Sequence, residues 1–385
     1  MPNFPGQISS KLPNVGTTIF TVMSKLATEH EAINLSQGFP DFNCNPKLTE
    51  LVFDAMKAGH NQYCPMPGLI SLREIIAQKT EQLYSARYNP ETEITITAGA
   101  TQAIFTAISA VVKEGDEVII FEPAYDCYLP AIELCGGKPI FIPLKFPHYE
   151  IDWEYVKKNI RQKTKLVIIN TPNNPTSSVL SAKDMQKLEK LLHNSNIMVL
   201  SDEVYEHILF DGYEHQSVAR YPKLAERSFI VSSFGKTYHT TGWKMGYCIA
   251  PKEMMTEFRK VHQYNVFSVN TPAQHAFAAI IKNKDLYLEL GSFYQEKRDY
   301  FRKLLNGSRF ILQDVAGTYF QLLRYNQISD EKDTEFAIRL TKEHKIASVP
   351  ISVFYHKPED HKVLRFCFAK GNETLEKAAE ILQKI

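Results

Sequence analysis

Residues 197–205 read IMVLSDEVY, and residues 228–236 read SFIVSSFGK. Each stretch opens with an apolar run that lacks polar alternation, which is typical of a strand buried on both faces of a sheet. Each run is followed by polar side chains that can carry chemistry: Asp202 and Tyr205 after the first, Ser233 and Lys236 after the second. The two stretches therefore predict two buried strands, each leading directly into candidate functional residues.

Further apolar runs of the same kind occupy residues 93–97, 117–121, 165–169 and 245–249. Amphipathic stretches separate several of these runs. Apolar residues recur at helical spacing over residues 103–112 and 185–192, and Ser181, with Asp184 three residues later, is a favourable helix N-cap. Strands that alternate with helices predict an α/β fold built on a mostly parallel sheet.

The pattern of strands alternating with helices ends at about residue 282. Residues 286–305 are charged and predict one long helix, followed by strands at 318–323 and 363–368 and helices at 334–344 and 374–383. We therefore expect a large domain of residues 45–281, and a smaller α+β domain formed by residues 1–44 together with 282–385.

Composition excludes several classes of function. The chain of 385 residues has 44 Lys and Arg against 43 Asp and Glu, a net charge of +1, so no general excess of positive charge favours nucleic-acid or membrane binding. The six cysteines form no CxxC pair, which favours reduced thiols over a zinc site or a disulfide framework. No secretory signal and no apolar run of ~20 residues is recognisable, so we expect a cytoplasmic protein.

The candidate functional residues follow the predicted strands. Gly99, Ala100 and Thr101 come after the first strand and open a helix, whereas Tyr125 and Asn174 come after the second and third. In open α/β sheets ligands bind beyond the carboxyl ends of the strands. All these residues are therefore expected to converge on one pocket with Asp202 and Lys236.

These residue types meet the requirements of pyridoxal 5′-phosphate. Its aldehyde needs a lysine amine, which later serves as a general base, and Lys236 can supply it. A carboxylate such as Asp202 keeps the pyridine nitrogen protonated. The phosphate needs helix N-terminal amides, hydroxyls and a cation, which residues 99–101, Ser233 and Lys244 can supply.

At this point a family resemblance emerges. Residues 201–205, followed by SSFGKTYHTTGWKMG at 232–246, resemble the lysine region of class I and II aminotransferases, which have pyridoxal-phosphate fold type I, the aspartate aminotransferase-like fold. NTPNNPT at 170–176 is similar to the Asn-Pro loop of that family, and Arg365 in RFCF matches its carboxylate-binding arginine. The resemblance extends from about Phe20 to the C-terminus.

The resemblance implies a role for each matching residue. Lys236 would hold the cofactor covalently and Asp202 would pair with its ring nitrogen. Tyr205 and Asn174 would contact the 3′-oxygen, and Tyr125 would stack on the ring. The remaining roles fall into three groups: phosphate binding by Ala100, Thr101, Ser233 and Lys244, with Tyr63 from the neighbouring subunit of a homodimer; α-carboxylate binding by Arg365, Asn174 and the Gly38 backbone; and a substrate pocket lined by Phe20, Tyr63, Tyr125 and Phe267.

One branch of the family is favoured. Lys244 stands where many class I enzymes have arginine, and a lysine there is usual in the branch of the kynurenine aminotransferases, glutamine transaminase K and bacterial methionine aminotransferases. Residues 35–42, 261–264 and 267–272 point to the same branch, and residues 17–21, 61–63 and 238–239 to its methionine aminotransferases. The resemblance implies ping-pong amino transfer from methionine and aromatic or other large neutral amino acids to 2-oxo acids.

Alternatives remain open. A kynurenine aminotransferase or cysteine-S-conjugate β-lyase would use the same residues, and a non-catalytic effector sensor is disfavoured by the balanced charge. Asp202 could be a helix cap, Tyr125 ordinary core packing and Asn174 turn chemistry. His207 and His239 lie near the motifs, but no metal-ligand spacing accompanies them.

Overall fold

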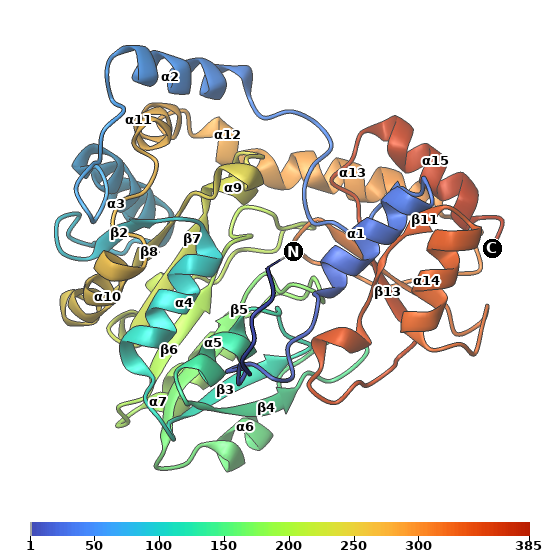
Figure 1. Cartoon of the computed structure of the whole chain (residues 1–385), viewed down its shortest axis with the longest axis horizontal. Coiled ribbons are helices and arrows are strands. Elements are labelled where there is room, and N and C mark those ends of the chain that lie inside the picture. The colour runs from blue at the N-terminus through green and yellow to red at the C-terminus, as the bar shows by residue number, and fades with distance from the viewer. Residues whose placement is uncertain (1) are drawn as a thin grey trace.

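The computed structural model describes residues 2–385, and its centre is a seven-stranded sheet (Figure 1). In spatial order the strands are β2 (Ile94–Thr97), β8 (Gly246–Ile249), β7 (Ser228–Ser233), β6 (Met198–Asp202), β5 (Thr164–Asn170), β3 (Glu117–Glu122) and β4 (Lys138–Pro143). Strand β8 is antiparallel to both of its neighbours, whereas the other neighbouring pairs are parallel. The mostly parallel sheet expected from the sequence is confirmed.

The apolar runs form the buried strands of this sheet. Every residue of β2, β3, β7 and β8 is buried, in agreement with runs that show no polar alternation. Strand β4, which the sequence analysis missed, lies at the edge, pairs only with β3 and is exposed at both ends. Its two prolines, Pro139 and Pro143, obscured it in the sequence, but an edge strand tolerates residues that cannot donate a hydrogen bond.

Helices cover both faces of the sheet. Helices α4 (Ala100–Val111), α5 (Tyr128–Leu134) and α10 (Lys252–Asn265) form one hydrophobic cluster with it, and α4 and α5 lie in front of the sheet in Figure 1. On the other face lie α3 (Ile70–Tyr84), α6 (Trp153–Asn159), α7 (Ala182–Leu192) and α11 (Thr271–Ile280), with α2 (Pro46–Lys57) packed on α11. Ser181 and Asp184 form a complete capping box on α7, as predicted.

The C-terminal part forms a second hydrophobic cluster with the N-terminal segment. It contains an antiparallel sheet of β12 (Val349–Pro350), β13 (Val363–Cys367), β10 (Phe320–Arg324) and β9 (Ile311–Leu312), with α14 (Asp333–Glu343) and α15 (Asn372–Leu382). Helix α1 (Ile19–Glu29) leads into β1 (Ile33–Asn34), which pairs with β11 (Ile346–Ala347). The α+β character of this part is as expected; the domain limits stay a prediction.

The long helix predicted for residues 286–305 is interrupted. The chain forms α12 (Asp285–Leu288), then Glu289, then α13 (Leu290–Leu304). A Cβ at Gly291 would lie 2.9 Å from the Leu209 carbonyl oxygen, so the start of α13 packs against the backbone after Tyr205 at a distance that only glycine permits. This contact between distant segments left no periodic signal in the sequence.

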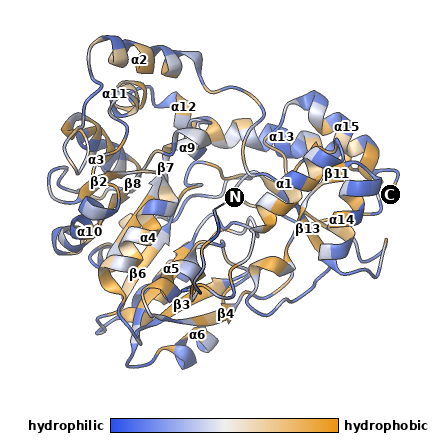
Figure 2. Cartoon of the chain, viewed as in Figure 1, coloured by the Kyte–Doolittle hydropathy of each residue, from blue (hydrophilic) through white to orange (hydrophobic). Residues whose placement is uncertain are grey.

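Figure 2 shows apolar residues concentrated in the strands of the central sheet, with polar residues toward the outside. Within residues 2–385, no helix combines the length and hydrophobicity that crossing a membrane requires.

Candidate active site

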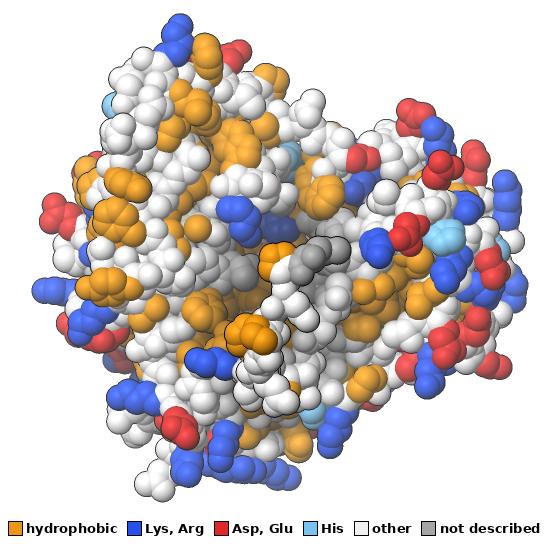
Figure 3. Space-filling model, in the orientation of Figure 1, with side chains coloured by type: hydrophobic (Ala, Val, Ile, Leu, Met, Phe, Trp, Pro, Cys, Tyr) orange, Lys and Arg blue, Asp and Glu red, His pale blue; other side chains and the backbone are white. Residues whose placement is uncertain are grey.

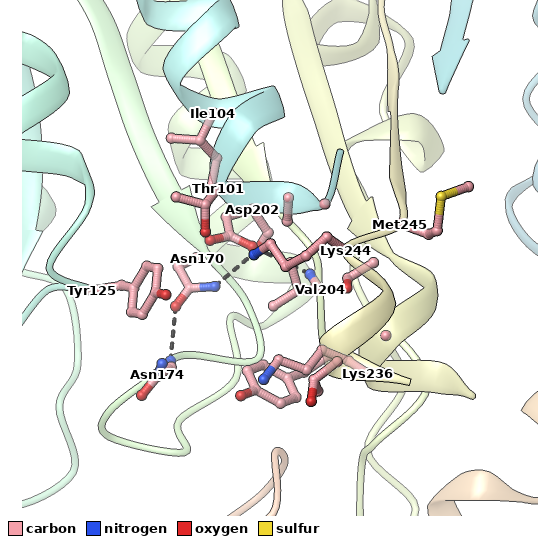
Figure 4. Close-up of a pocket in the computed structure, with 16 residues that line it drawn as sticks. Thr101, Ile104, Tyr125, Asn170, Asn174, Asp202, Val204, Lys236, Lys244 and Met245 are labelled. Carbon is pink, nitrogen blue, oxygen red and sulfur yellow. Dashed lines mark hydrogen bonds between the residues drawn. The ribbon is translucent and has the colours of Figure 1, made fainter. Parts of the chain in front are cut away.

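A cavity of about 130 Å³ opens at the carboxyl edge of the central sheet (Figure 4). With the exception of Tyr63, every cofactor-binding residue predicted from the sequence lines it. These residues are Gly99, Ala100, Thr101, Tyr125, Asn174, Asp202, Tyr205, Ser233, Lys236 and Lys244, and they are joined by Ile104, Asn170, Val204, Gly235, Thr241 and Met245. The predicted convergence on one pocket is therefore what the structure shows.

Sheet topology explains why residues far apart in the chain meet here. Strands β5, β6 and β7 are parallel and end at the same edge, which brings Asn170, Asp202 and Ser233 together. Strand β8 runs in the opposite direction, so its beginning lies at that edge and Lys244 just precedes it. Helix α4 starts there as well, because β2 is antiparallel to β8.

Lys236 lies in the single-turn helix α9 (Phe234–Thr237), directly after β7. Its Nζ donates hydrogen bonds to the Gly38 carbonyl oxygen at 2.9 Å and to the Tyr319 hydroxyl at 2.9 Å. Burial lowers the pKa of Lys236 to about 8, because the charged amine loses its hydration. A lysine with such a pKa has an appreciable neutral, nucleophilic fraction near neutral pH.

Asp202 is the last residue of β6. Its Oδ2 accepts a 2.5 Å hydrogen bond from the Tyr128 hydroxyl, and its Oδ1 accepts one from the Val204 amide at 3.3 Å. Burial raises the pKa of Asp202 to about 6, although these hydrogen bonds partly oppose the rise. A cationic group bound beside this carboxylate would stabilise its charged form.

An anion-binding geometry exists at the beginning of the 12-residue helix α4. Gly99 caps this helix with φ of +83°, and a Cβ there would lie 3.5 Å from Lys244 Nζ. A Cβ at Gly246 would lie 2.7 Å from the Ser232 carbonyl oxygen and 3.1 Å from the Ala100 amide nitrogen. Two glycines thus let the helix start, the end of β7 and the lysine approach closely, as a phosphate site requires.

Arg365 lies on β13 and is buried. Its Nη1 donates to Asn174 Oδ1 at 2.5 Å, and its Nη2 donates to the Ser36 carbonyl oxygen at 3.1 Å. The Phe320 and Phe20 ring centroids lie 3.9 and 5.3 Å from its Cζ. Its Nε is buried without a hydrogen-bond partner within residues 2–385, which is unusual for a buried donor.

Two predicted site residues lie elsewhere. Tyr63 is 80% exposed and Phe267 42% exposed, and their rings contact each other with centroids 5.2 Å apart. Neither lines the cavity of its own chain. Gly38, Phe20 and Arg365 do not line the cavity either. Gly38 contacts the lining residue Lys236, Arg365 contacts the lining residue Asn174, and Phe20 lies beside Arg365.

Three polar residues that contact predicted site residues were not themselves predicted: Asn170, Tyr128 and Tyr319. Asn170 accepts from the Asn174 amide at 2.8 Å and donates to the Asp202 carbonyl oxygen at 2.9 Å; its position at the end of a predicted strand was a usable signal. Tyr128 lies three residues after Tyr125, at the beginning of α5, and this nearness in sequence was the available signal. Tyr319, whose hydroxyl contacts Lys236, left none, because it comes from a distant part of the chain.

The histidines near the motifs do not form a metal site. No cluster of three or more His, Cys, Asp or Glu side chains with metal-binding geometry occurs in the part of the chain that the structure describes. Burial lowers the pKa of His207 to about 3 and that of His239 to about 4, so both rings are neutral near pH 7.

The fold and this site define an enzyme of the aminotransferase type. The chain belongs to the aminotransferase class I and II family, whose model matches residues 30–382. It is 50% identical to methionine aminotransferase of Escherichia coli (strain K12) over 386 residues, which cover 100% of both chains. Kynurenine–oxoglutarate transaminase 1 of Homo sapiens is 33% identical, with 94% of each chain covered.

Solved structures agree with the sequence relatives. The crystal structure of YbdL from Escherichia coli, reported with a methionine aminotransferase function, has 50% identity and a TM-score of 0.97, and the match covers 99% of this chain and 100% of that one. A Thermus thermophilus aspartate aminotransferase double mutant has 27% identity and a TM-score of 0.90, with 98% and 99% covered. The predicted family, enzyme class and aspartate aminotransferase-like fold are confirmed.

Proposed function

We propose that this aminotransferase uses pyridoxal 5′-phosphate to move the amino group of methionine and of aromatic or other large neutral amino acids to 2-oxo acids by a ping-pong mechanism. One observation carries the proposal. A lysine with a lowered pKa, a buried carboxylate and the start of helix α4 line the same cavity. Arg365 contacts the lining residue Asn174 through Nη1, and its Nε has no hydrogen-bond partner within residues 2–385.

The residues fit the cofactor. The close approach of Gly99, Lys244 and the α4 amides suits a phosphate, and Asp202 suits a protonated ring nitrogen. Tyr125, Tyr205 and Asn174 line the same cavity, where they would hold the ring. When bound, the cofactor supplies an electron-accepting ring that makes the α-proton of an attached amino acid acidic.

The protein's own residues supply the remaining steps. Arg365 and Asn174 orient the α-carboxylate of the amino acid, with the Arg365 Nε as the free donor. Lys236 would take the proton from the Cα of the amino acid and deliver it to the cofactor carbon that carries the aldehyde, for which a pKa of about 8 is well suited. Burial of the site excludes water from the charges that develop during this transfer.

The surroundings favour a large neutral side chain. A second cavity of about 430 Å³ shares Tyr125 with the first and is lined mainly by apolar residues, among them Ile19, Val22 and Phe354. Phe20 and Phe354 have ring centroids 5.9 Å apart beside Arg365. The methionine aminotransferase relative supports methionine as one donor. One methylene in such a pocket is worth only ~1–3 kcal/mol, so several donors are expected.

A homodimer completes this proposal. Tyr63 would reach the phosphate of the neighbouring subunit, which agrees with its exposure in a single chain. Figure 3 shows hydrophobic side chains on the surface formed by α2, α3 and α10, where Phe53, Met56 and Tyr264 are exposed.

We place the enzyme in the cytoplasm, with residues 45–281 as the large domain and residues 1–44 and 282–385 as the small one.

The absorbance spectrum of the protein loaded with pyridoxal 5′-phosphate tests the function. After addition of L-methionine without any oxo acid, we expect loss of the band of the lysine-bound cofactor and release of 2-oxo acid in an amount equal to the enzyme. Lys236→Ala should show neither. A wild-type spectrum that contains no cofactor band, or does not respond to any amino acid, would contradict the proposal.

A second candidate function is supported by the kynurenine–oxoglutarate transaminases among the relatives. The same site would then favour kynurenine, or would eliminate the β-substituent of a cysteine S-conjugate. Comparison of kcat/KM for methionine, phenylalanine, kynurenine and aspartate separates the donors. Ammonia that accumulates from a cysteine S-conjugate, without net amino transfer, would identify a β-lyase.

A further inference from the structure

Two polar groups meet at the amine of Lys236. Its Nζ donates to the Tyr319 hydroxyl and to the Gly38 carbonyl oxygen, each at 2.9 Å, and the Tyr319 hydroxyl in turn donates to the same Gly38 oxygen at 2.5 Å. Tyr319 itself is fully buried. The amine is thus held at two points, and of these Tyr319 has no role among the expected cofactor and substrate contacts.

The protonation state of the Tyr319 hydroxyl is fixed by its surroundings. Burial holds the pKa of Tyr319 well above its usual range, so the phenol keeps its proton and donates it to Gly38. The Tyr319 oxygen can then only accept from Lys236. Its ring is fixed by edge contacts with Tyr205 at 5.2 Å and Phe320 at 5.0 Å between centroids.

The loop that carries Gly38 also contacts the arginine of the carboxylate site. The Ser36 carbonyl oxygen accepts from Arg365, two residues before the carbonyl that holds Lys236. A Cβ at Gly38 would lie 2.9 Å from Phe320, the residue whose ring covers Arg365. The position of the amine and the position of the carboxylate-binding group therefore depend on one short loop.

We propose that Tyr319 is a positioning residue for Lys236: together with the Gly38 carbonyl, it holds the amine in the place from which Lys236 transfers the proton. This inference rests on the proposed function and assigns a residue outside its cofactor and substrate contacts. Tyr319 acts through the lysine and itself exchanges no proton with substrate.

The test uses Tyr319→Phe, with Tyr294→Phe as the matched control. Tyr294 is also buried, its ring centroid lies 5.5 Å from that of Tyr319, and its hydroxyl has no hydrogen-bond partner within residues 2–385. Both variants lose one hydroxyl and keep the ring. Only the first removes an acceptor from Lys236.

The first readout is the pKa of Lys236 in the cofactor-free protein, measured from the pH dependence of its labelling by trace acetic anhydride. The titratable groups around the amine, Asp202, Lys244, Arg365 and the Cys367 thiol, are unchanged in the variants. Loss of an acceptor for the charged amine should lower this pKa by about one unit in Tyr319→Phe and leave it unchanged in Tyr294→Phe. Equal values in wild type and Tyr319→Phe would overturn the proposal.

The second readout is steady-state kinetics with methionine. We expect kcat to fall about tenfold or more in Tyr319→Phe. KM should stay within about twofold of the wild-type value, because Arg365 is untouched. The pH profile of kcat should shift with the pKa of Lys236. The labelling needs no cofactor, so failure of the proposed function and failure of this inference are distinguishable.

A third measurement does not depend on any variant folding. In a crystal structure of the wild-type protein with pyridoxamine 5′-phosphate, Lys236 Nζ should lie within about 3.2 Å of the Tyr319 hydroxyl. An amine that lies out of hydrogen-bond range of Tyr319 in that structure would also overturn the proposal.

Discussion

The Tyr128 hydroxyl donates a hydrogen bond of 2.5 Å to Oδ2 of Asp202, and both side chains are buried. Tyr128 begins helix α5, whereas Asp202 ends strand β6, so the contact joins an element that covers the sheet to the carboxyl edge of the sheet. It favours the ionised form of the carboxylate, and so partly opposes the burial that raises the pKa of Asp202 to about 6.

Tyr128→Phe should therefore raise the pKa of Asp202 further, by about one unit, because a hydrogen bond to the charged form is lost. Less carboxylate would be ionised at pH 6–7 than in wild type. We expect weaker binding of pyridoxal 5′-phosphate and lower kcat at pH 6.5, with recovery toward pH 8, measured by cofactor titration at several pH values.

Tyr149→Phe is the control for this variant, since the Tyr149 hydroxyl is buried without a partner in the described part of the chain. It should bind the cofactor as wild type does at every pH. A Tyr128→Phe enzyme whose cofactor affinity has the wild-type pH dependence would show that the hydrogen bond does not tune Asp202.

The contact with Tyr128 also shows how far the sequence could lead. Asp202 and Lys236 were predicted because buried parallel strands end in them, and the strand periodicity and the motif agree at that point. Tyr128 is close in sequence to Tyr125, so it could have been considered as a neighbour of that residue. These parts of the site are local consequences of strand ends and helix starts.

Other parts could not be predicted, because they depend on how distant segments pack. Tyr319 and Gly38 are 281 residues apart, and no periodic pattern encodes their hydrogen bond. Strand β4 was hidden because its edge position tolerates prolines that argue against a strand in a sequence. Next to the break at Glu289, Gly291 packs closely against the backbone of Leu209, a contact that only the folded chain contains.

The pKa of Lys236 gives a pH prediction. A value of about 8 means that the amine is mostly neutral above pH 8 and mostly protonated below it. Only the neutral amine can attack an aldehyde. The rate at which cofactor-free enzyme takes up pyridoxal 5′-phosphate, followed by absorbance, should rise with pH and reach half its maximum near pH 8.

An unshifted lysine would instead show a rate that still rises at pH 10, as its ordinary pKa requires. Lys236→Arg provides the control, because a guanidinium keeps the positive charge but stays protonated over this range. It should show no covalent uptake at any pH.

Arg365→Lys should weaken substrate binding strongly, although the substitution keeps the positive charge. The guanidinium contacts Asn174 and Ser36 at once and offers Nε to the ligand, whereas an ammonium cannot reproduce this fork. The loss of a buried charged hydrogen bond costs ~2–5 kcal/mol, so KM for methionine should rise by at least about thirtyfold.

Arg302→Lys, on helix α13, is the control and should leave KM unchanged, because Arg302 bonds to Gln313 and Gln321 outside the cavity. Cofactor absorbance should be normal in both variants. An Arg365→Lys enzyme with wild-type KM would remove this residue from the carboxylate site.

A buried ion pair behind the site predicts a change in stability. Lys79 Nζ lies 2.8 Å from Glu206 Oε1, and Glu206 also accepts from Tyr84, Ser232 and Tyr247. The Coulombic attraction of Lys79, together with these hydrogen bonds, holds the pKa of Glu206 well below its usual range against the effect of burial. Lys79→Met would leave this carboxylate buried without a counter-charge. We expect the free energy of unfolding in urea to fall by ~3–5 kcal/mol. Lys47→Met, which breaks the exposed pair with Glu50, should change it by less than about 1 kcal/mol. Equal stabilities of the two variants would mean that Glu206 is neutral or solvated in the folded enzyme.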